Sequence, residues 1–108
     1  DFTYIDNVVQ MNMLAIETSN PEAVNQIYNT ACGERTTLNQ LVSYLKEFLN
    51  EFDPGVKNID PMYGPNRIGD IPHSLANIDK AKRLLGYNPQ FNMKQGIKEA
   101  IKWYWMNL

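Results

Sequence analysis

An arginine and an aspartate lie three residues apart in a segment stiffened by proline and glycine. The segment reads Pro-Asn-Arg-Ile-Gly-Asp-Ile-Pro, with Arg67 and Asp70 on either side of Gly69. A guanidinium offers a planar fork of donors that fits phosphate oxygens in pairs, and a nearby carboxylate can accept hydrogen bonds from sugar hydroxyls. The spacing therefore predicts a loop that binds a nucleotide diphosphate or a similar anion. The alternative is an exposed ion pair that only holds the loop, because such pairs are common and weak.

Other groups with chemical potential have simpler structural interpretations. Tyr44 precedes Lys46 by two residues within a helical pattern, and no acidic or nucleophilic group is spaced to orient the single histidine, His73. Cys32 is the only cysteine, which excludes an internal disulfide and a multi-cysteine zinc site. A free cysteine usually behaves as a small buried hydrophobic residue. We therefore predict no catalytic, cofactor-binding or metal-binding residue in these 108 positions.

Helical periodicity dominates the elements that must position the loop. Two short runs with β-branched and aromatic residues, 26–29 and 56–59, predict strands. The expected fold is thus α/β, a small lobe of mixed helices and short strands. The expected helices are one following Asp6, one over 38–52 capped by Thr36 or Thr37, one beginning at Asn77 or Asp79 and ending at Gly86, and one beginning at Asn92.

The first expected helix is apolar over more than one face. Met11, Leu14 and Ala15 add a second apolar surface to the main one, which suggests packing on two sides or against a partner. The main surface comprises Ile5, Val8, Val9, Asn12, Met13 and Ile16.

Several motifs together resemble a known family. The pattern Arg-x-Gly-Asp-x-x-x-Ser-x-Ala over 67–76, followed by Leu-Leu-Gly-Tyr-x-Pro over 84–89, resembles the C-terminal substrate-binding part of extended short-chain dehydrogenase/reductases that act on nucleotide sugars. Residues 1–10 are similar to the family's Arg-Asp-Phe/Tyr segment without its leading arginine, and 26–41 to its Val-Tyr-Asn and Gly-x-x-Thr/Ser-Leu motifs. The run 33–41, His73-Ser74-Leu75 and Trp103-Tyr104 look most like bacterial UDP-N-acetylglucosamine 4-epimerases of surface-polysaccharide synthesis.

This resemblance implies a function for part of a larger enzyme. Residues 1–108 would form the C-terminal substrate-binding lobe of a UDP-sugar 4-epimerase, in which NAD takes a hydride from the fourth sugar carbon and returns it to the other face. Arg67 would contact the pyrophosphate and Asp70 the uridine ribose, while Ser74 would face the sugar and Phe2 would line the nucleotide side. Ile68 stands where the family often has Glu, and Asn77 where Asp is frequent.

The catalytic and NAD-binding residues would lie outside this chain. The sequence contains no G-x-G-x-x-G turn and no Tyr-x-x-x-Lys pair on an expected helix. A separate Rossmann lobe would supply both, the fragment alone would be inactive, and the complete enzyme would be a homodimer. The alternatives are a nucleotide-sugar dehydratase or decarboxylase lobe and a non-enzymatic interaction module, for which Trp103 and Trp105 would be suitable contacts.

Composition limits the remaining classes. The net charge is −2 with both signs interspersed, so no basic stripe suggests nucleic-acid binding. No apolar run approaches the length of about 18 residues that a membrane span requires. We therefore expect a cytoplasmic protein without nucleic-acid or membrane partners.

Overall fold

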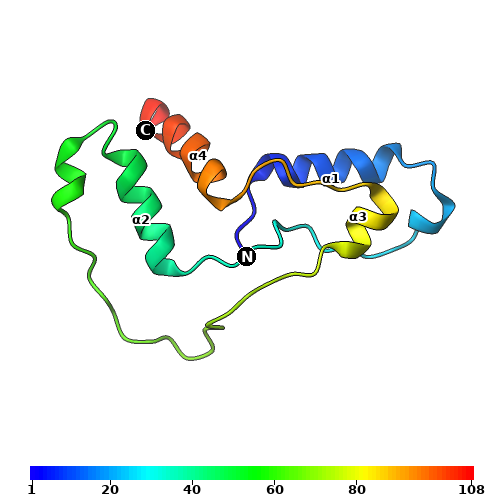
Figure 1. The fold of residues 1–108 in the computed structure, drawn as a ribbon, viewed down its shortest axis with the longest axis horizontal. Coiled ribbons are helices and arrows are strands. Elements are labelled where there is room, and N and C mark those ends of the chain that lie inside the picture. Colours follow the sequence, from blue (N-terminus) through cyan, green and yellow to red (C-terminus); the bar gives the residue numbers. More distant parts are fainter.

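A computed structural model describes all residues, 1–108, as a flat, elongated array of helices (Figure 1). Four α-helices and two 3₁₀ turns follow in the order α1 (Ile5–Glu17), η1 (Pro21–Ala23), α2 (Leu38–Leu49), η2 (Pro54–Asn58), α3 (Asp79–Leu85) and α4 (Met93–Asn107). The radius of gyration is 17.1 Å, whereas a compact domain of this length would have about 13 Å. No helix has both the length and the apolar character needed to cross a membrane.

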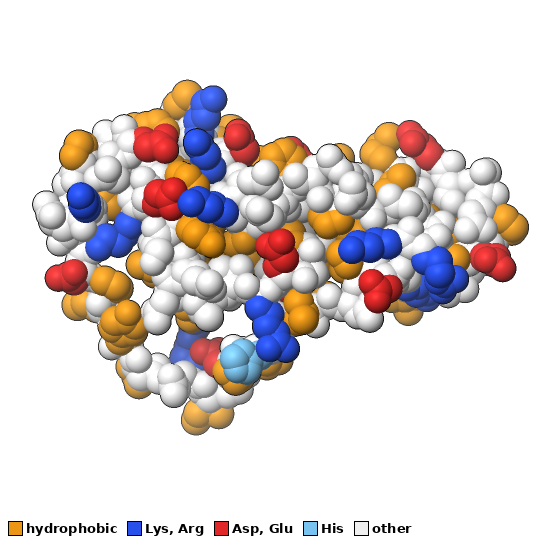
Figure 2. Space-filling view, in the orientation of Figure 1, with side chains coloured by type: hydrophobic (Ala, Val, Ile, Leu, Met, Phe, Trp, Pro, Cys, Tyr) orange, Lys and Arg blue, Asp and Glu red, His pale blue; other side chains and the backbone are white.

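Two separate apolar clusters divide the molecule. One lies among α1, η1 and α3, and the other lies between α2 and α4, at opposite ends of Figure 1. Only 12 of the 108 residues are buried, so much apolar surface stays open to solvent, and hydrophobic side chains are visible over much of the face in Figure 2. The first cluster contains Met11, Ala23, Ala31, Ile78, Ala81, Leu85 and Tyr87, and the second contains Phe48, Ile97 and Ile101.

The helix termini follow the local sequence closely. Thr37 caps α2 and Asn92 caps α4, each in a capping box with a glutamine three residues later, Gln40 and Gln95. Gly86 ends α3 in the left-handed conformation, with φ +69°, as expected for a C-terminal glycine. The helix predicted over 38–52 ends earlier, at Leu49.

The start of α1 differs from the prediction. The helix begins at Ile5, one residue before the expected cap, and Asp6 lies in its first turn. Tyr4 is the capping residue and makes no side-chain capping bond. A carboxylate in the first turn still interacts favourably with the helix dipole, which explains why Asp6 is tolerated inside the helix.

Both predicted strands are wrong, and the described chain contains no strand at all. Residues 26–29 are not helical, but no other segment pairs with them, and Ile27 is 89% exposed. Residues 56–58 belong to η2, because the Asp53 side chain accepts a hydrogen bond from the Gly55 amide and starts a tight turn. The lobe as described is therefore all-helical rather than α/β.

The buried face of α1 coincides with part of the second predicted surface. Asn7 and Met11 are its buried residues, with Leu14 packed beside them, whereas Ala15 is exposed. The side chains of Ile5, Val9, Met13 and Ile16 are 47–78% exposed. Their spacing places them in a single stripe along the helix.

Candidate functional site

The predicted binding residues Arg67, Asp70 and Ser74 lie on the segment 59–77, hereafter the site loop, which has no helix or strand. In Figure 1 this segment swings away from the helices as a long green-to-yellow connection. At its start Lys46 donates to the Ile59 carbonyl oxygen at 2.6 Å, and the Tyr63 hydroxyl donates to the Asn39 side chain at 3.2 Å. The site loop is thus attached to α2 near its beginning.

The other attachment lies at the end of the site loop. The main-chain nitrogen of Asp1 donates to the Ser74 carbonyl oxygen at 2.8 Å, and the Asn29 side chain donates to the Asn77 carbonyl oxygen at 3.1 Å. Between the two attachments the hydrogen bonding is local, since the Asp70 amide donates to the Arg67 carbonyl oxygen at 3.3 Å. The middle of the loop is therefore held only through the attachments at its two ends.

Arg67 and Asp70 face each other across the turn in this middle part. The Arg67 Nε and Asp70 Oδ2 atoms are 3.5 Å apart, and the two side chains are 86% and 63% exposed. Gly69 occupies a left-handed position, φ +88°, which a residue with a side chain would adopt only with strain. The ion pair that the alternative interpretation predicts is present. Exposed ion pairs contribute about 0–1 kcal/mol to stability. Breaking the Arg67–Asp70 pair to bind a phosphate would therefore cost little.

Phe2 and Ser74 are brought together by the main chain rather than by their side chains. The Asp1–Ser74 hydrogen bond places the two segments next to each other, and Phe2 is 37% exposed beside this contact. No hydrogen bond or ion pair links either residue to Arg67 or Asp70. The four predicted site residues therefore lie in two places. Phe2 lies near Ser74 at the end of the site loop, and Arg67 lies beside Asp70 in its turn.

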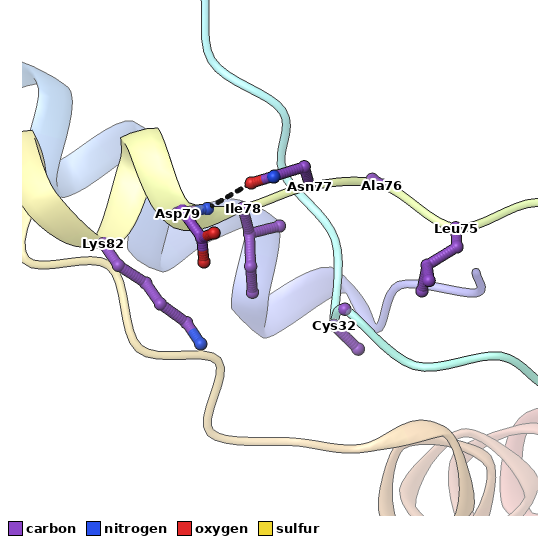
Figure 3. A pocket seen from close by; sticks show the side chains of 8 residues that line it. Cys32, Leu75, Ala76, Asn77, Ile78, Asp79 and Lys82 are labelled. Atoms are coloured by element: carbon purple, nitrogen blue, oxygen red, sulfur yellow. Dashed lines mark hydrogen bonds between the residues drawn. The ribbon is translucent and has the colours of Figure 1, made fainter.

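A shallow hollow of about 330 Å³ lies beside the anchored end of the site loop. Figure 3 shows Leu75, Ala76 and Asn77 crossing above Cys32, while Lys82 extends from α3. The Asn77 side chain accepts from the Asp79 amide at 2.8 Å, drawn as the dashed line, in a local turn that leads into α3. The helix begins at Asp79, one of the two predicted starts, and its N-cap residue is Ile78.

The environment of Cys32 keeps its thiol protonated. Burial raises the pKa of Cys32, and Glu34 raises it further, although a hydrogen bond from Asn7 acts in the opposite direction. The sulfur lies 3.3 Å from the carbonyl oxygens of Phe2 and Phe91, which suits a thiol donor. Cys32 is therefore a structural group, in line with the sequence-based interpretation.

Two residues that matter for this geometry were not identified from the sequence. Asp1 bonds to three backbone amides in two other segments, and Asn7 is fully buried while it bonds to residues 90 and 91. Asn7 could have been noticed, because it shares one helix face with Met11 and Leu14, where a polar residue is unexpected. No pattern of neighbouring residues shows the role of Asp1, since its hydrogen-bond partners are 31 to 75 residues away.

The residues of this chain do not fit a NAD site. Pyrophosphate binding in a dinucleotide fold uses a Gly-rich turn between a strand and a helix. The described structure has no strand, and its left-handed glycines, Gly33, Gly69 and Gly86, are each in separate loops. No residue of the chain is therefore assigned to a dinucleotide.

Comparisons with known proteins point to one class, the UDP-sugar 4-epimerases. No family model matches the chain. UDP-glucuronate 4-epimerase 2 of Arabidopsis thaliana is 31% identical over 96% of the chain, and a putative UDP-glucose 4-epimerase of Methanocaldococcus jannaschii is 28% identical over 95%. The crystal structure of UDP-glucose 4-epimerase from Thermotoga maritima, solved with UDP-glucose, superposes with a TM-score of 0.82 at 34% identity over 98% of the chain.

The chain is therefore homologous to a segment of UDP-sugar 4-epimerases. It spans only 25% of the plant relative, 30% of the archaeal relative and 31% of the solved bacterial chain. The resemblance noted in the sequence is confirmed at this level, for epimerases acting on nucleotide sugars.

Proposed function

We propose that residues 1–108 are the C-terminal, nucleotide-sugar-binding portion of a NAD-dependent UDP-sugar 4-epimerase. The observation that carries the proposal is similarity in both sequence and structure over nearly the whole chain, to a bacterial enzyme solved with UDP-glucose. The dinucleotide and the catalytic groups belong to a separate Rossmann lobe, since none of the present residues suits them. On its own this portion is inactive.

Four residues of the chain contact the substrate in this proposal. Arg67 binds the pyrophosphate and Asp70 accepts from the uridine ribose, while Ser74 faces the sugar and Phe2 lies along the nucleotide. The exposure of the Arg67 guanidinium and its weak pairing with Asp70 support this assignment, because neither group must break a strong contact to bind. Charge-assisted contacts to phosphate contribute about 1.5–3 kcal/mol, so one exposed arginine binds weakly until a second lobe encloses the ligand.

The exposed stripe of α1 supports docking onto the rest of the enzyme. Its four apolar side chains lie on one exposed face of α1, while Met11 and Leu14 of the same helix pack into the first cluster. Contiguous apolar patches commonly mark contact surfaces. We assign this stripe to the contact with the Rossmann lobe. The complete enzyme is a homodimer in this proposal, assembled through the other lobe.

The preferred substrate is UDP-N-acetylglucosamine, or its galacto epimer, in the synthesis of surface polysaccharides. This finer assignment depends on the run 33–41, on His73-Ser74-Leu75 and on Trp103-Tyr104. The similar proteins carry the names UDP-glucuronate and UDP-glucose 4-epimerase, so these two sugars are the direct competitors. A dehydratase or decarboxylase lobe is the rival within the family.

Binding and turnover by the complete protein test the proposal. Titration calorimetry with UDP should show binding that Arg67→Ala weakens by about 10- to 100-fold, the loss of one charge-assisted phosphate contact. Arg83→Ala removes another exposed arginine, from α3, and should leave the affinity unchanged. Unchanged affinity in Arg67→Ala would contradict the assigned site.

The substrate assignment is tested separately by following each UDP-sugar with NMR. We expect the galacto product from UDP-N-acetylglucosamine to form faster than products from UDP-glucose or UDP-glucuronate. Loss of water or of carbon dioxide from the sugar would instead identify a dehydratase or a decarboxylase. The two measurements are independent, because UDP binding does not depend on which sugar is turned over.

A second candidate function, a non-enzymatic interaction module, is favoured by one feature. An apolar hollow of about 450 Å³ is open at the end of α2 and α4, formed by Leu49, Ile101, Tyr104, Trp105 and Leu108. Phe52 stacks on Trp105 beside it, with ring centroids 5.3 Å apart. Absence of UDP binding by the complete protein would favour this second function.

A further inference from the structure

Asp1 connects three segments that are distant in the sequence. Its Oδ1 atom accepts a hydrogen bond from the Cys32 amide at 3.1 Å, and its Oδ2 atom accepts from the Gly33 amide at 3.0 Å and from the Ala76 amide at 3.4 Å. Its main-chain nitrogen donates to the Ser74 carbonyl oxygen at 2.8 Å. We refer to these four hydrogen bonds as the Asp1 anchor.

The backbone around Gly33 is arranged to suit a carboxylate. Two successive amides, those of residues 32 and 33, donate to the same anion, and Gly33 itself adopts a left-handed φ of +73°. A Cβ atom at this position would come within 3.2 Å of Ile78 Cδ1, so the turn is also closely packed against the start of α3. Hydrogen bonds from amides to an ionised carboxylate are about twice as strong as neutral ones.

The Asp1 anchor joins the site loop at Ser74, four residues after Asp70. Residues 64–73 make no hydrogen bond to any other part of the chain, so the loop's position depends on its two ends. At its start the contacts come from the flexible side chains of Lys46 and Tyr63. At the end, Asp1 bonds to the Ser74 carbonyl oxygen through its main-chain nitrogen and to the Ala76 amide through its carboxylate, and the Asn29 side chain bonds to the Asn77 carbonyl oxygen.

We propose that Asp1 is a positioning residue for nucleotide binding, which holds the end of the site loop so that Arg67 and Asp70 reach the substrate from a fixed base. The main-chain nitrogen of Asp1 also places Phe2 beside the Ser74 segment, and the carboxylate ties that segment to residues 32 and 33. This inference rests on the function proposed above. Asp1 does not touch the substrate and acts only through the loop.

An amide in place of the carboxylate should disturb the anchor with little change in volume. Asp1→Asn keeps one acceptor oxygen but turns an NH₂ group toward backbone amides, so the Oδ1 and Oδ2 contacts cannot both persist. In the complete protein we expect the Kd for UDP and the KM for the UDP-sugar to rise about five- to tenfold, with kcat within twofold of wild type. Asp53→Asn is the control, because Asp53 accepts only from Gly55 within its own turn.

A double-mutant cycle separates positioning from a general structural effect. If Asp1 acts through the loop, Asp1→Asn should weaken UDP binding in the wild type but change the Kd less than twofold in an Arg67→Ala background. A residue that only stabilises the fold would lower the Tm, and the folded fraction would keep the wild-type Kd. Should Asp1→Asn not fold, Asp1→Glu keeps the charge but displaces it by one methylene, and should raise the Kd in the same direction.

The outcomes distinguish the two proposals. Wild-type binding of UDP that Arg67→Ala weakens and Asp1→Asn does not would overturn the role of Asp1 and leave the proposed function in place. An equal effect of Asp1→Asn in both backgrounds would also overturn the positioning role. Failure of the wild-type complete protein to bind UDP would overturn both.

Discussion

The site loop and the region around Asn7 differ in how their polar groups are satisfied. In the site loop, residues 64–73 bond only among themselves, and Arg67 is 86% exposed. Asn7 is fully buried, and its side chain accepts from the amides of Gln90 and Phe91 at 2.9 and 3.2 Å and donates to the Phe91 carbonyl oxygen at 2.7 Å. One region contributes stability, and the other keeps its polar groups open to solvent.

The region around Asn7 also joins the two apolar clusters. The segment 88–92 connects α3 with α4, and Asn7 fixes it against α1. Nearby, the Tyr87 hydroxyl donates to the Ala31 carbonyl oxygen at 2.8 Å in a buried contact, and the Tyr4 and Phe91 rings lie 4.9 Å apart. Residues 64–73 make no such long-range contacts, so this part of the chain can change conformation at little cost to the fold.

The largest effect on stability is expected from Asn7→Ala in the complete protein. The change leaves two part-buried amides and one part-buried carbonyl oxygen without their partner. A buried polar group left unsatisfied costs about 1–3 kcal/mol. We expect the free energy of unfolding in urea to fall by about 3 kcal/mol or more. Asn12→Ala removes an exposed amide from the same helix and should cost less than about 0.5 kcal/mol. Equal losses of unfolding free energy in Asn7→Ala and Asn12→Ala would contradict the stabilising role of the Asn7 hydrogen bonds.

A smaller loss is expected from Gly96→Ala in α4. An added Cβ atom would lie 2.7 Å from Tyr4 Cβ, so the helix or the Tyr4 backbone must shift. We expect a net loss of about 1–3 kcal/mol despite the better helix propensity of alanine. Gly64→Ala in the site loop is the control. A Cβ atom at Gly64 would have no other atom within 4 Å, so the midpoint of thermal unfolding should change little. A Gly96→Ala variant more stable than wild type would show that the contact between Gly96 and Tyr4 leaves room for a methyl group.

Titration of Cys32 should produce a modest pH dependence of stability. Burial raises the pKa of this thiol in the folded state above its ordinary value of 9.0. Its contribution is fully present below that value, and it is lost as pH rises from about 9 through the folded pKa, because the unfolded chain releases the proton first. Urea unfolding at several pH values should show a steeper decline above pH 9 for wild type than for Cys32→Ala. Equal declines would mean that the thiol is not desolvated.

The smallest effect is expected from Ile68→Ser in the middle of the site loop. The Ile68 side chain is fully exposed, so its replacement removes no packing. The unfolding midpoint should stay within experimental error of wild type, since surface substitutions away from special contacts change stability by less than about 0.5 kcal/mol. A clear loss of stability would mean that the loop packs against the rest of the complete protein.

Local chemistry made most of the helices predictable. Thr37, Gly86 and Asn92 set helix ends through contacts within four residues, and their roles are visible in the sequence. The strands failed for a physical reason, because a strand needs a partner and the segment 26–29 has none in this chain. At 56–59, the turn started by Asp53 outweighed β propensity.

The candidate site was predictable in part. Arg67 and Asp70 were identified from their spacing, and they form a pair in the exposed loop as that spacing allows. Their binding role stays a prediction, as do those of Phe2 and Ser74. Asp1 and Asn7 could not be assigned from spacing, because their partners come from segments 25 to 84 residues away.

The sequence alone determined the starts of α2 and α4, the end of α3, and the likeness to nucleotide-sugar enzymes. These features depend on neighbours in the chain, whose geometry is fixed by short-range hydrogen bonds and backbone sterics. Only the tertiary structure decided which face of α1 is buried, and that Asp1 supports the site loop. Burial and long-range hydrogen bonds depend on how distant segments meet, and the pattern of one segment does not contain that information.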